Sequence, residues 1–252
     1  MSARLGLFLT AGLVLGAGLV VGIADLPAGS SAEGPYARAL TELAVERRAL
    51  NAVAGVLFDL RSLDTLGEAL ALFAAAAGLQ LTLRGLPGED DDDGEVDARR
   101  GASDRRIPET SDAVRTLSFA LVPALAGLAA IVTLRGHLVP GGGLQGGALA
   151  LAALAMIFLG GHYRSQQRLA PDTLLEVEEA VGAGGYALVG LVALFVGGAL
   201  LENVLPLGTP GQLLSAGTVG VLGILVALEA RAALGVILTE VQEEPFEREG
   251  SA

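Results

Sequence analysis

The stretch Val114 to Leu134 reads V-R-T-L-S-F-A-L-V-P-A-L-A-G-L-A-A-I-V-T-L and carries one charged residue, Arg115. A helix needs roughly 20 apolar residues to cross the hydrocarbon core of a bilayer, so this stretch predicts a membrane span. Five further runs have few or no charges: Leu5 to Ala24, Thr65 to Leu83, Gly147 to Gly161, Val181 to Leu201 and Gln212 to Leu238. The sequence therefore predicts an all-α, polytopic transmembrane helix bundle.

A shorter apolar run, Ala49 to Leu60, follows the charged segment Glu46-Arg47-Arg48 and ends beside Arg61. It is either a further span or an interfacial helix. We expect a span, because a helix inside a bundle can begin at polar residues that find protein partners. This gives about seven spans, or about six if residues 49–60 do not cross.

Composition excludes several classes of function. Cysteine is absent from the 252 residues, which rules out disulfides, iron–sulfur ligation and thiolate zinc sites in this chain. The net charge of −12 argues against nucleic acid as a partner. No cofactor or metal site is expected. The first apolar run is longer than the core of a typical secretory signal, so we expect an uncleaved helix, with cleavage after Ala28 as the alternative.

Between Gly85 and Asp112 the chain changes character, with the acidic run Glu89 to Asp93 followed by two pairs of arginines. We interpret residues 85–112 as a solvated linker, because the acidic run lacks the alternating ligand spacing of a calcium loop. It separates a three-helix part, residues 1–84, from a four-helix part, residues 113–240, and an acidic tail, residues 241–252. The positive-inside rule favours a cytoplasmic linker and C-terminus, with the N-terminus outside for seven spans and inside for six.

The segment Asn51 to Glu68 reads N-A-V-A-G-V-L-F-D-L-R-S-L-D-T-L-G-E and brings Asp59, Arg61, Asp64 and Glu68 to the start of a predicted span. Arg61, Asp64 and Glu68 share one face if the helix is continuous. Asp64 is a candidate N-cap for a helix that begins at Thr65. Glu68 lies a turn further in, where an unpaired carboxylate costs about 2.5–3.5 kcal/mol, so we favour a functional role for it.

Residues 137–147 read H-L-V-P-G-G-G-L-Q-G-G. Their glycines match a dinucleotide-binding pattern in form, but a membrane helix precedes them and not a strand, which excludes that function. We expect a tight turn led by Pro140, followed by a helix whose Gly143 and Gly147 let another backbone approach closely. His137 has no partner histidine nearby, so an orienting or capping role is favoured over metal ligation. His162 is expected at the membrane interface.

In the last apolar run Glu229 and Arg231 lie two residues apart, so they project to nearly opposite sides and cannot pair. Each must face protein or water, and such charges mark ion pathways or subunit contacts. The alternative is that Arg231 snorkels to the interface. No nucleophile triad, H-E-x-x-H or P-loop occurs, so the chain is not expected to be an enzyme.

The acidic segment Asn51 to Glu68 and the glycine-rich turn at residues 137–147 resemble parts of a known family. The segment Asn51 to Glu68 resembles the C-terminal region of the A subunit of Mrp-type Na+/H+ antiporters, and a small subunit of membrane-bound hydrogenases. The stretch Gly136 to Gly147, with L-S-A-G-T at Leu214 to Thr218, resembles the antiporter's B subunit, which is MnhB-like. The family has an aromatic residue followed by Arg-Gly where this chain has Leu60, Arg61 and Ser62, so the chain departs from the pattern at Leu60 and Ser62, and also at Leu144, where the family has Phe.

The resemblance implies a non-catalytic subunit that works only inside a hetero-oligomeric membrane complex, with Na+ and H+ as transported ions. By this resemblance the acidic motif comprises Asp59, Arg61, Asp64 and Glu68, and the turn motif His137, Pro140, Gly141, Gly142, Gly143, Gly146 and Gly147. A subunit of a redox-driven complex such as a membrane-bound hydrogenase is the alternative. A structural scaffold, whose charges serve as caps and subunit contacts, is the third interpretation.

Overall fold

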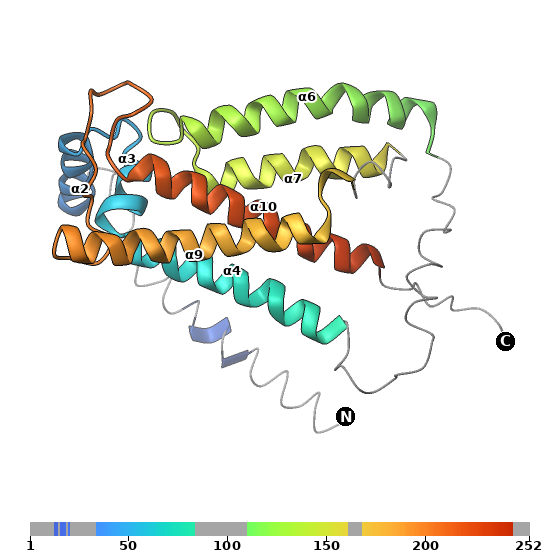
Figure 1. Ribbon diagram of the computed structural model, residues 1–252, viewed down its shortest axis with the longest axis horizontal. Helices are drawn as coiled ribbons and strands as arrows, with labels where there is room; N and C mark the ends of the chain where they lie inside the picture. Colours follow the sequence, from blue (N-terminus) through green and yellow to red (C-terminus); the bar gives the residue numbers. More distant parts are fainter. Residues whose placement is uncertain are drawn as a thin grey trace. The chain divides into compact units, whose positions relative to one another are not determined.

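The computed structural model describes residues 34–83, 110–160 and 168–243, together with six positions between 13 and 20 (Figure 1). Internal contacts divide the chain into two compact units, Met1–Ala39 and Leu40–Ala252. In the first unit, positions 13, 14, 16–18 and 20 of the expected first span are helical. The rest of that span, most of the linker, His162 and residues 244–252 lie outside the described residues.

All regular secondary structure in the described ranges is helical, and four helices are long and apolar enough to cross a membrane, α4, α6, α9 and α10. Helix α7 is a shorter apolar helix. This confirms the all-α membrane fold. The elements are α2 (Pro35–Glu46), α3 (Ala52–Gly55), the π-helix η1 (Val56–Leu60), α4 (Ser62–Leu83), α6 (Asp112–Leu134), α7 (Gly143–Leu159), α9 (Asp172–Val196) and α10 (Val219–Glu243).

Residues 49–60 do not form a span. Helix α3 and the π-helix η1 together hold nine residues, about 13 Å at most, and end at Arg61 before α4 begins. The expectation that this segment crosses the bilayer is therefore wrong, and the alternative that it does not cross holds. The segment is short because its first turn is capped by Asn51 and its end is wound into a π-turn, in which the Arg61 amide donates to the Val56 carbonyl at 2.8 Å.

Two helices differ in extent from the apolar runs in the sequence. Helix α9 begins at Asp172, nine residues before the run at Val181, and so contains three glutamates. The helix continues through these glutamates, because some of them are buried against other helices. Helix α10 begins at Val219 and not at Gln212, since the irregular segment 197–218 precedes it. Gly208, Gly211 and Gly217 have positive φ in that segment.

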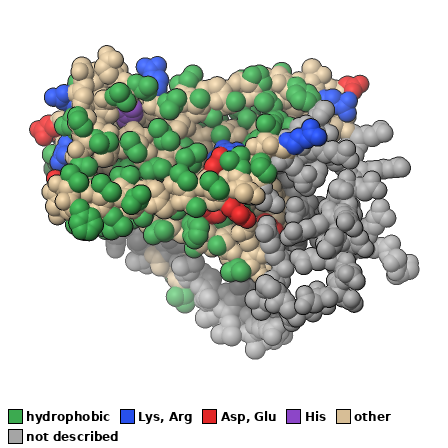
Figure 2. All heavy atoms as spheres, in the orientation of Figure 1, with side chains coloured by type: hydrophobic (Ala, Val, Ile, Leu, Met, Phe, Trp, Pro, Cys, Tyr) green, Lys and Arg blue, Asp and Glu red, His purple; other side chains and the backbone are tan. Residues whose placement is uncertain are grey.

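Helix α10 lies at the centre of the second unit and packs against α9, α7 and α4, while α6 packs against α7 (Figure 1). Successive spans run in opposite directions, so the segments before α4, between α6 and α7, and between α9 and α10 meet at one end (Figure 1). We call this the polar end; it comprises residues 47–65, 135–142 and 197–218. Hydrophobic side chains cover much of the face in Figure 2, with acidic side chains interrupting them near its middle.

Glycines set the close approach of α7 to α10. A Cβ at Gly147 would lie 2.5 Å from the Ala227 carbonyl oxygen and 2.9 Å from the Ala230 Cβ. A Cβ at Gly143 would overlap the Gly223 carbonyl oxygen. This confirms the prediction that Gly143 and Gly147 admit a second backbone.

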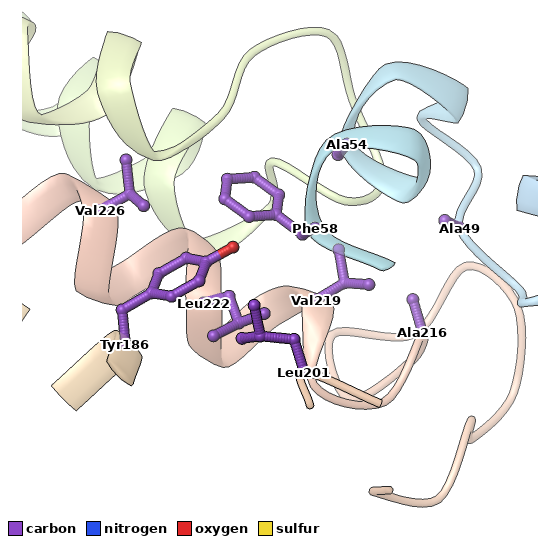
Figure 3. Packing of buried hydrophobic residues seen from close by; sticks show 9 residues of the cluster. All are labelled: Ala49, Ala54, Phe58, Tyr186, Leu201, Ala216, Val219, Leu222 and Val226. Atoms are coloured by element: carbon purple, nitrogen blue, oxygen red, sulfur yellow. The ribbon is translucent and has the colours of Figure 1, made fainter. Parts of the chain in front are cut away.

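A buried apolar cluster joins the polar end to helices α9 and α10 (Figure 3). Phe58 of η1 and Tyr186 of α9 meet side chains of α10 there, and Tyr186 is fully buried. Its hydroxyl donates to the Ser62 carbonyl oxygen at 3.1 Å, which fixes the start of α4 relative to α9. The members are Ala49, Ala54, Phe58, Tyr186, Leu201, Ala216, Val219, Leu222 and Val226.

Candidate functional site

Asn51 joins the acidic motif to the glycine-rich turn. Its Nδ2 lies 2.7 Å from the Gly136 carbonyl oxygen, 3.0 Å from that of Val139 and 3.2 Å from that of Gly141. Its backbone amide donates to the His137 carbonyl at 3.0 Å, and its Oδ1 caps α3. The two sequence motifs therefore form one structure at the polar end.

Asp59 is held at the polar end by Asn203. The Asp59 side chain is 4% exposed, and its Oδ2 accepts from Asn203 Nδ2 at 3.0 Å. Arg47 Nε lies 3.9 Å from the same oxygen. Asn203 also donates to the Ala216 carbonyl at 3.0 Å and accepts from the Thr218 amide at 2.8 Å. Asp59 is thus a buried, partnered carboxylate that ties η1 to the segment before α10.

Arg61, Asp64 and Glu68 lie on the outward side of the chain. Arg61 Nε donates to Asp64 Oδ2 at 2.6 Å, so the spacing correctly brings these two residues together. Asp64 is inside the first turn of α4, which begins at Ser62, and the prediction that it caps a helix at Thr65 is wrong. Glu68 is exposed in the candidate span Ser62–Thr82. The ion pair and Glu68 are therefore exposed side chains at the start of α4.

The turn motif differs in detail from its prediction. The chain reverses at Arg135 to Leu138, where the Leu138 amide donates to the Arg135 carbonyl at 2.8 Å, so Pro140 follows the turn and does not lead it. Gly141 has φ of 140° and lies against Val132, where a Cβ would come within 2.8 Å of Val132 Cγ1. Gly142 precedes α7, and a Cβ at Gly146 would overlap Thr133. Tight packing accounts for these glycines.

His137 is buried in this turn, at 3% exposure. Neither ring nitrogen has a hydrogen-bond partner within the described ranges, so the side chain caps no helix there. Burial lowers the pKa of His137, and the nearby backbone of Gln212 and Leu213 opposes this only in part. The imidazole lines a small enclosed space with Ala54 and Phe58 and with α10 residues, so it packs as a neutral side chain.

A second group of charges lies where α9 meets α10, and we call it the α9–α10 charge group: Glu178, Glu179, Glu229 and Arg231. Arg231 Nη2 pairs with Glu178 Oε1, and the two side chains are 15% and 16% exposed. Glu229 is 1% exposed and Glu179 7% exposed. As the spacing predicts, Glu229 and Arg231 do not pair with each other. Arg231 reaches across to α9 in this pair, and its snorkelling to the interface stays an alternative prediction.

Sequence reasoning missed Glu178 and Glu179. They belong to L-L-E-V-E-E-A-V-G at 174–182, directly before a run that seemed to begin at Val181. Glutamates followed at once by an apolar, glycine-containing run are the signal that could have identified them. Asn51 and Asn203 were missed as well, because each resembles an ordinary loop asparagine until its distant partners are known.

Among the described residues, no group of three His, Cys, Asp or Glu side chains could hold a metal ion. The described arrangement offers carboxylates inside candidate spans, and such groups can bind small cations or protons.

Comparisons with known proteins show which family and which solved structures the chain resembles. A family model described as a domain related to the MnhB subunit of Na+/H+ antiporter matches residues 113–237. The Methanocaldococcus jannaschii protein MJ1307, whose function is uncharacterized, is 33% identical over 196 residues, 73% of this chain and 74% of that protein.

Two solved structures resemble the chain over nearly all of its length. A chain of the membrane-bound sulfane sulfur reductase, an archaeal respiratory membrane complex, superimposes with a TM-score of 0.67 and 25% identity, covering 97% of this chain and 100% of that one. A chain of the Mrp complex from Dietzia sp. DQ12-45-1b shares the fold, with a TM-score of 0.65, 24% identity and coverage of 100% of this chain and 27% of that one. The family match and the relative lead to one conclusion: the chain belongs to the MnhB-related family of membrane proteins.

Proposed function

We propose that the chain is a non-catalytic membrane subunit of a multisubunit antiporter that exchanges Na+ for H+, and that it contributes to the ion path and to assembly. The family match and the likeness to the Mrp complex support this proposal. The two motif-bearing halves, residues 1–84 and 113–240, would then combine parts that resemble the A and B subunits. The complex would lie in the cell membrane with the linker and C-terminus on the cytoplasmic side.

One observation carries the proposal most directly: Glu68 is exposed within the candidate span of α4. A carboxylate at that depth costs about 2.5–3.5 kcal/mol on insertion scales when it faces lipid. Its polar surroundings must therefore come from another subunit or from water at a subunit boundary. Glu68, supported by Arg61 and Asp64, would belong to a cation or proton path shared with a neighbouring subunit, and Glu229 to a second polar patch.

Transport by the whole complex tests this proposal. Glu68→Ala and Glu68→Gln are introduced into the complex, and Na+-driven collapse of a pH gradient is followed in inverted membrane vesicles. Both variants are expected to lower the rate at least tenfold while the complex still assembles. Leu70→Ala is the matched control, because Leu70 is also exposed on α4, at 48%. Undiminished antiport in both Glu68 variants would contradict the role of Glu68.

A redox-driven complex is the second candidate. The match to a whole chain of the sulfane sulfur reductase favours it, because a chain of the same extent occurs in that respiratory complex. Purification of the tagged chain in mild detergent, with mass spectrometry of the native complex, separates the two candidates. Large antiporter-type subunits alone support the antiporter, whereas co-purifying iron–sulfur subunits support the redox complex. A scaffold role predicts instead that Glu68→Gln abolishes assembly.

A further inference from the structure

Helices α9 and α10 touch at the depth of Glu229. A Cβ built on Gly182 would lie 2.5 Å from the Glu229 Cβ and 2.7 Å from its backbone nitrogen. Glu179 is one helical turn before Gly182, on the same side of α9. Each of the two glutamates is more than nine-tenths buried, and the charge of Glu179 acts on Glu229. The packing thus brings two carboxyl groups together inside candidate spans.

Within helices α4, α7, α9 and α10, no basic side chain is free to neutralise this pair. Arg231 is the only basic residue in α4, α7, α9 and α10, and it is already paired with Glu178. Helix α7 has no titratable residue, and the acidic residues of α4, Asp64 and Glu68, are exposed on the outward side. Glu176, which is exposed, adds a further negative charge near Glu179. The surroundings of the pair are therefore apolar or negative.

One oxygen of each carboxyl group also lacks a hydrogen-bond donor among the described residues. Glu179 Oε1 and Glu229 Oε1 are buried without a partner within the described ranges, as is Glu178 Oε2. A buried carboxylate without a donor or counter-ion is costly, and two that share a site cannot both remain ionised. The pair requires a bound cation. A metal ion needs a shell of several oxygens, which these side chains do not provide, whereas a proton needs only two.

We propose that Glu179 and Glu229 together hold one exchangeable proton, which one carboxyl group carries as an O–H and donates in a hydrogen bond to the other. This deepens the role given above to Glu229 and rests on the proposed function for its place in transport. Arg231 pairs with Glu178 beside the two glutamates, so its charge is already engaged there. The proton enters and leaves by transfer between carboxyl oxygens and water, with no other bond made or broken.

Infrared difference spectroscopy of the purified full-length chain in its complex tests the proposal. At neutral pH an ordinary glutamate is ionised, so a neutral carboxylic acid band in apolar surroundings identifies the pair. The wild-type complex is expected to show one such band, shifted in D2O and lost on raising the pH. The double variant Glu179→Gln/Glu229→Gln should lack it. Glu202→Gln, in the exposed segment before α10, is the matched control and should retain it.

Three outcomes would overturn the proposal: no band at neutral pH, a band that persists in the double variant, or a band removed by Na+ at constant pH but not by choline. The last outcome would assign the pair to a metal cation. The single variant Glu179→Gln should move the loss of the band to lower pH, because the repelling charge is gone. The band can be present while Glu68 variants transport normally, so failure of the Glu68 path and failure of the proton pair are distinguishable.

Discussion

Gly182 of α9 packs directly on the backbone of α10 at Glu229. Gly182→Ala is expected to push the helices apart and to lower the free energy of unfolding by about 1–3 kcal/mol, because the nearest atoms, the Cβ, N and Cα of Glu229, are fixed by the α10 backbone and cannot rotate away. Gly184→Ala is the matched control, since a Cβ there meets nothing within 4 Å. Thermal unfolding in detergent, with the remaining folded protein measured by size-exclusion chromatography, checks this loss of stability. Equal stability of the two variants would contradict the close packing.

Removal of Arg231 should leave Glu178 as an uncompensated charge within the bundle. Arg231→Ala is expected to lower the free energy of unfolding by about 3 kcal/mol, the lower end for a broken buried pair, because both side chains keep some exposure. Glu178→Ala/Arg231→Ala should cost less than Arg231→Ala alone. A double-mutant cycle on reversible unfolding in micelles measures this coupling. Strict additivity of the two single variants would disprove it.

Asn51 is expected to be the most sensitive side chain at the polar end. Asn51→Ala removes a helix cap and leaves carbonyls of the turn without a donor, at a cost of about 1–3 kcal/mol. Asn51→Asp should be no better, because it keeps the cap acceptor but turns a carboxylate oxygen toward those carbonyls. Faster hydrogen exchange of the amides of residues 136–139, 141 and 142, with Leu50→Ala as an exposed neighbouring control, reports the loss. Unchanged exchange in both Asn51 variants would contradict it.

His137 should make stability depend on pH. Burial lowers its pKa from the ordinary value of 6.5, so the unfolded chain takes up a proton at a higher pH than the folded chain. The contribution of the neutral imidazole to the free energy of unfolding is therefore complete above about pH 6.5. It is lost as the pH falls through that value toward the lower pKa that His137 has in the folded chain. Melting temperatures on the two sides of that value measure the effect. His137→Gln should flatten the decline, and an equal decline in both proteins would exclude His137 as its source.

The helix class and most spans could be predicted from the sequence, because long apolar runs leave few alternatives in a membrane. The ends of the helices could not. Glu178 and Glu179 seemed to exclude the start of α9 from the membrane, yet Arg231 and α10 cover them, and Arg231 is 53 positions away from Glu178 in sequence. A hydropathy profile averages over residues that are adjacent in sequence, whereas these charges are accommodated by residues of another helix that are distant in sequence.

Residues 49–60 show the same limit. Their apolar character suggested a span, but the π-turn at η1 depends on contacts that sequence spacing does not contain. Thr65 Oγ1 donates to the Leu57 carbonyl at 2.8 Å, and Ser62 Oγ donates to the Asp59 carbonyl at 3.1 Å. It was predictable that the side chains of Glu229 and Arg231 project to opposite sides of the helix, because this follows from helix geometry alone. Their surroundings were not, because those depend on which helices meet.

The asparagine contacts of the polar end also constrain the order of biosynthesis. Asn51 bonds to a turn that is synthesised about 85 to 90 residues later, and Asp59 to an asparagine 144 residues later. During translation the first of these polar groups leaves the ribosome long before its partners exist. The polar end can close only after residue 218 has emerged and the last helix has entered the bilayer. The polar end therefore forms late in folding, and a nascent chain truncated before these residues cannot form it.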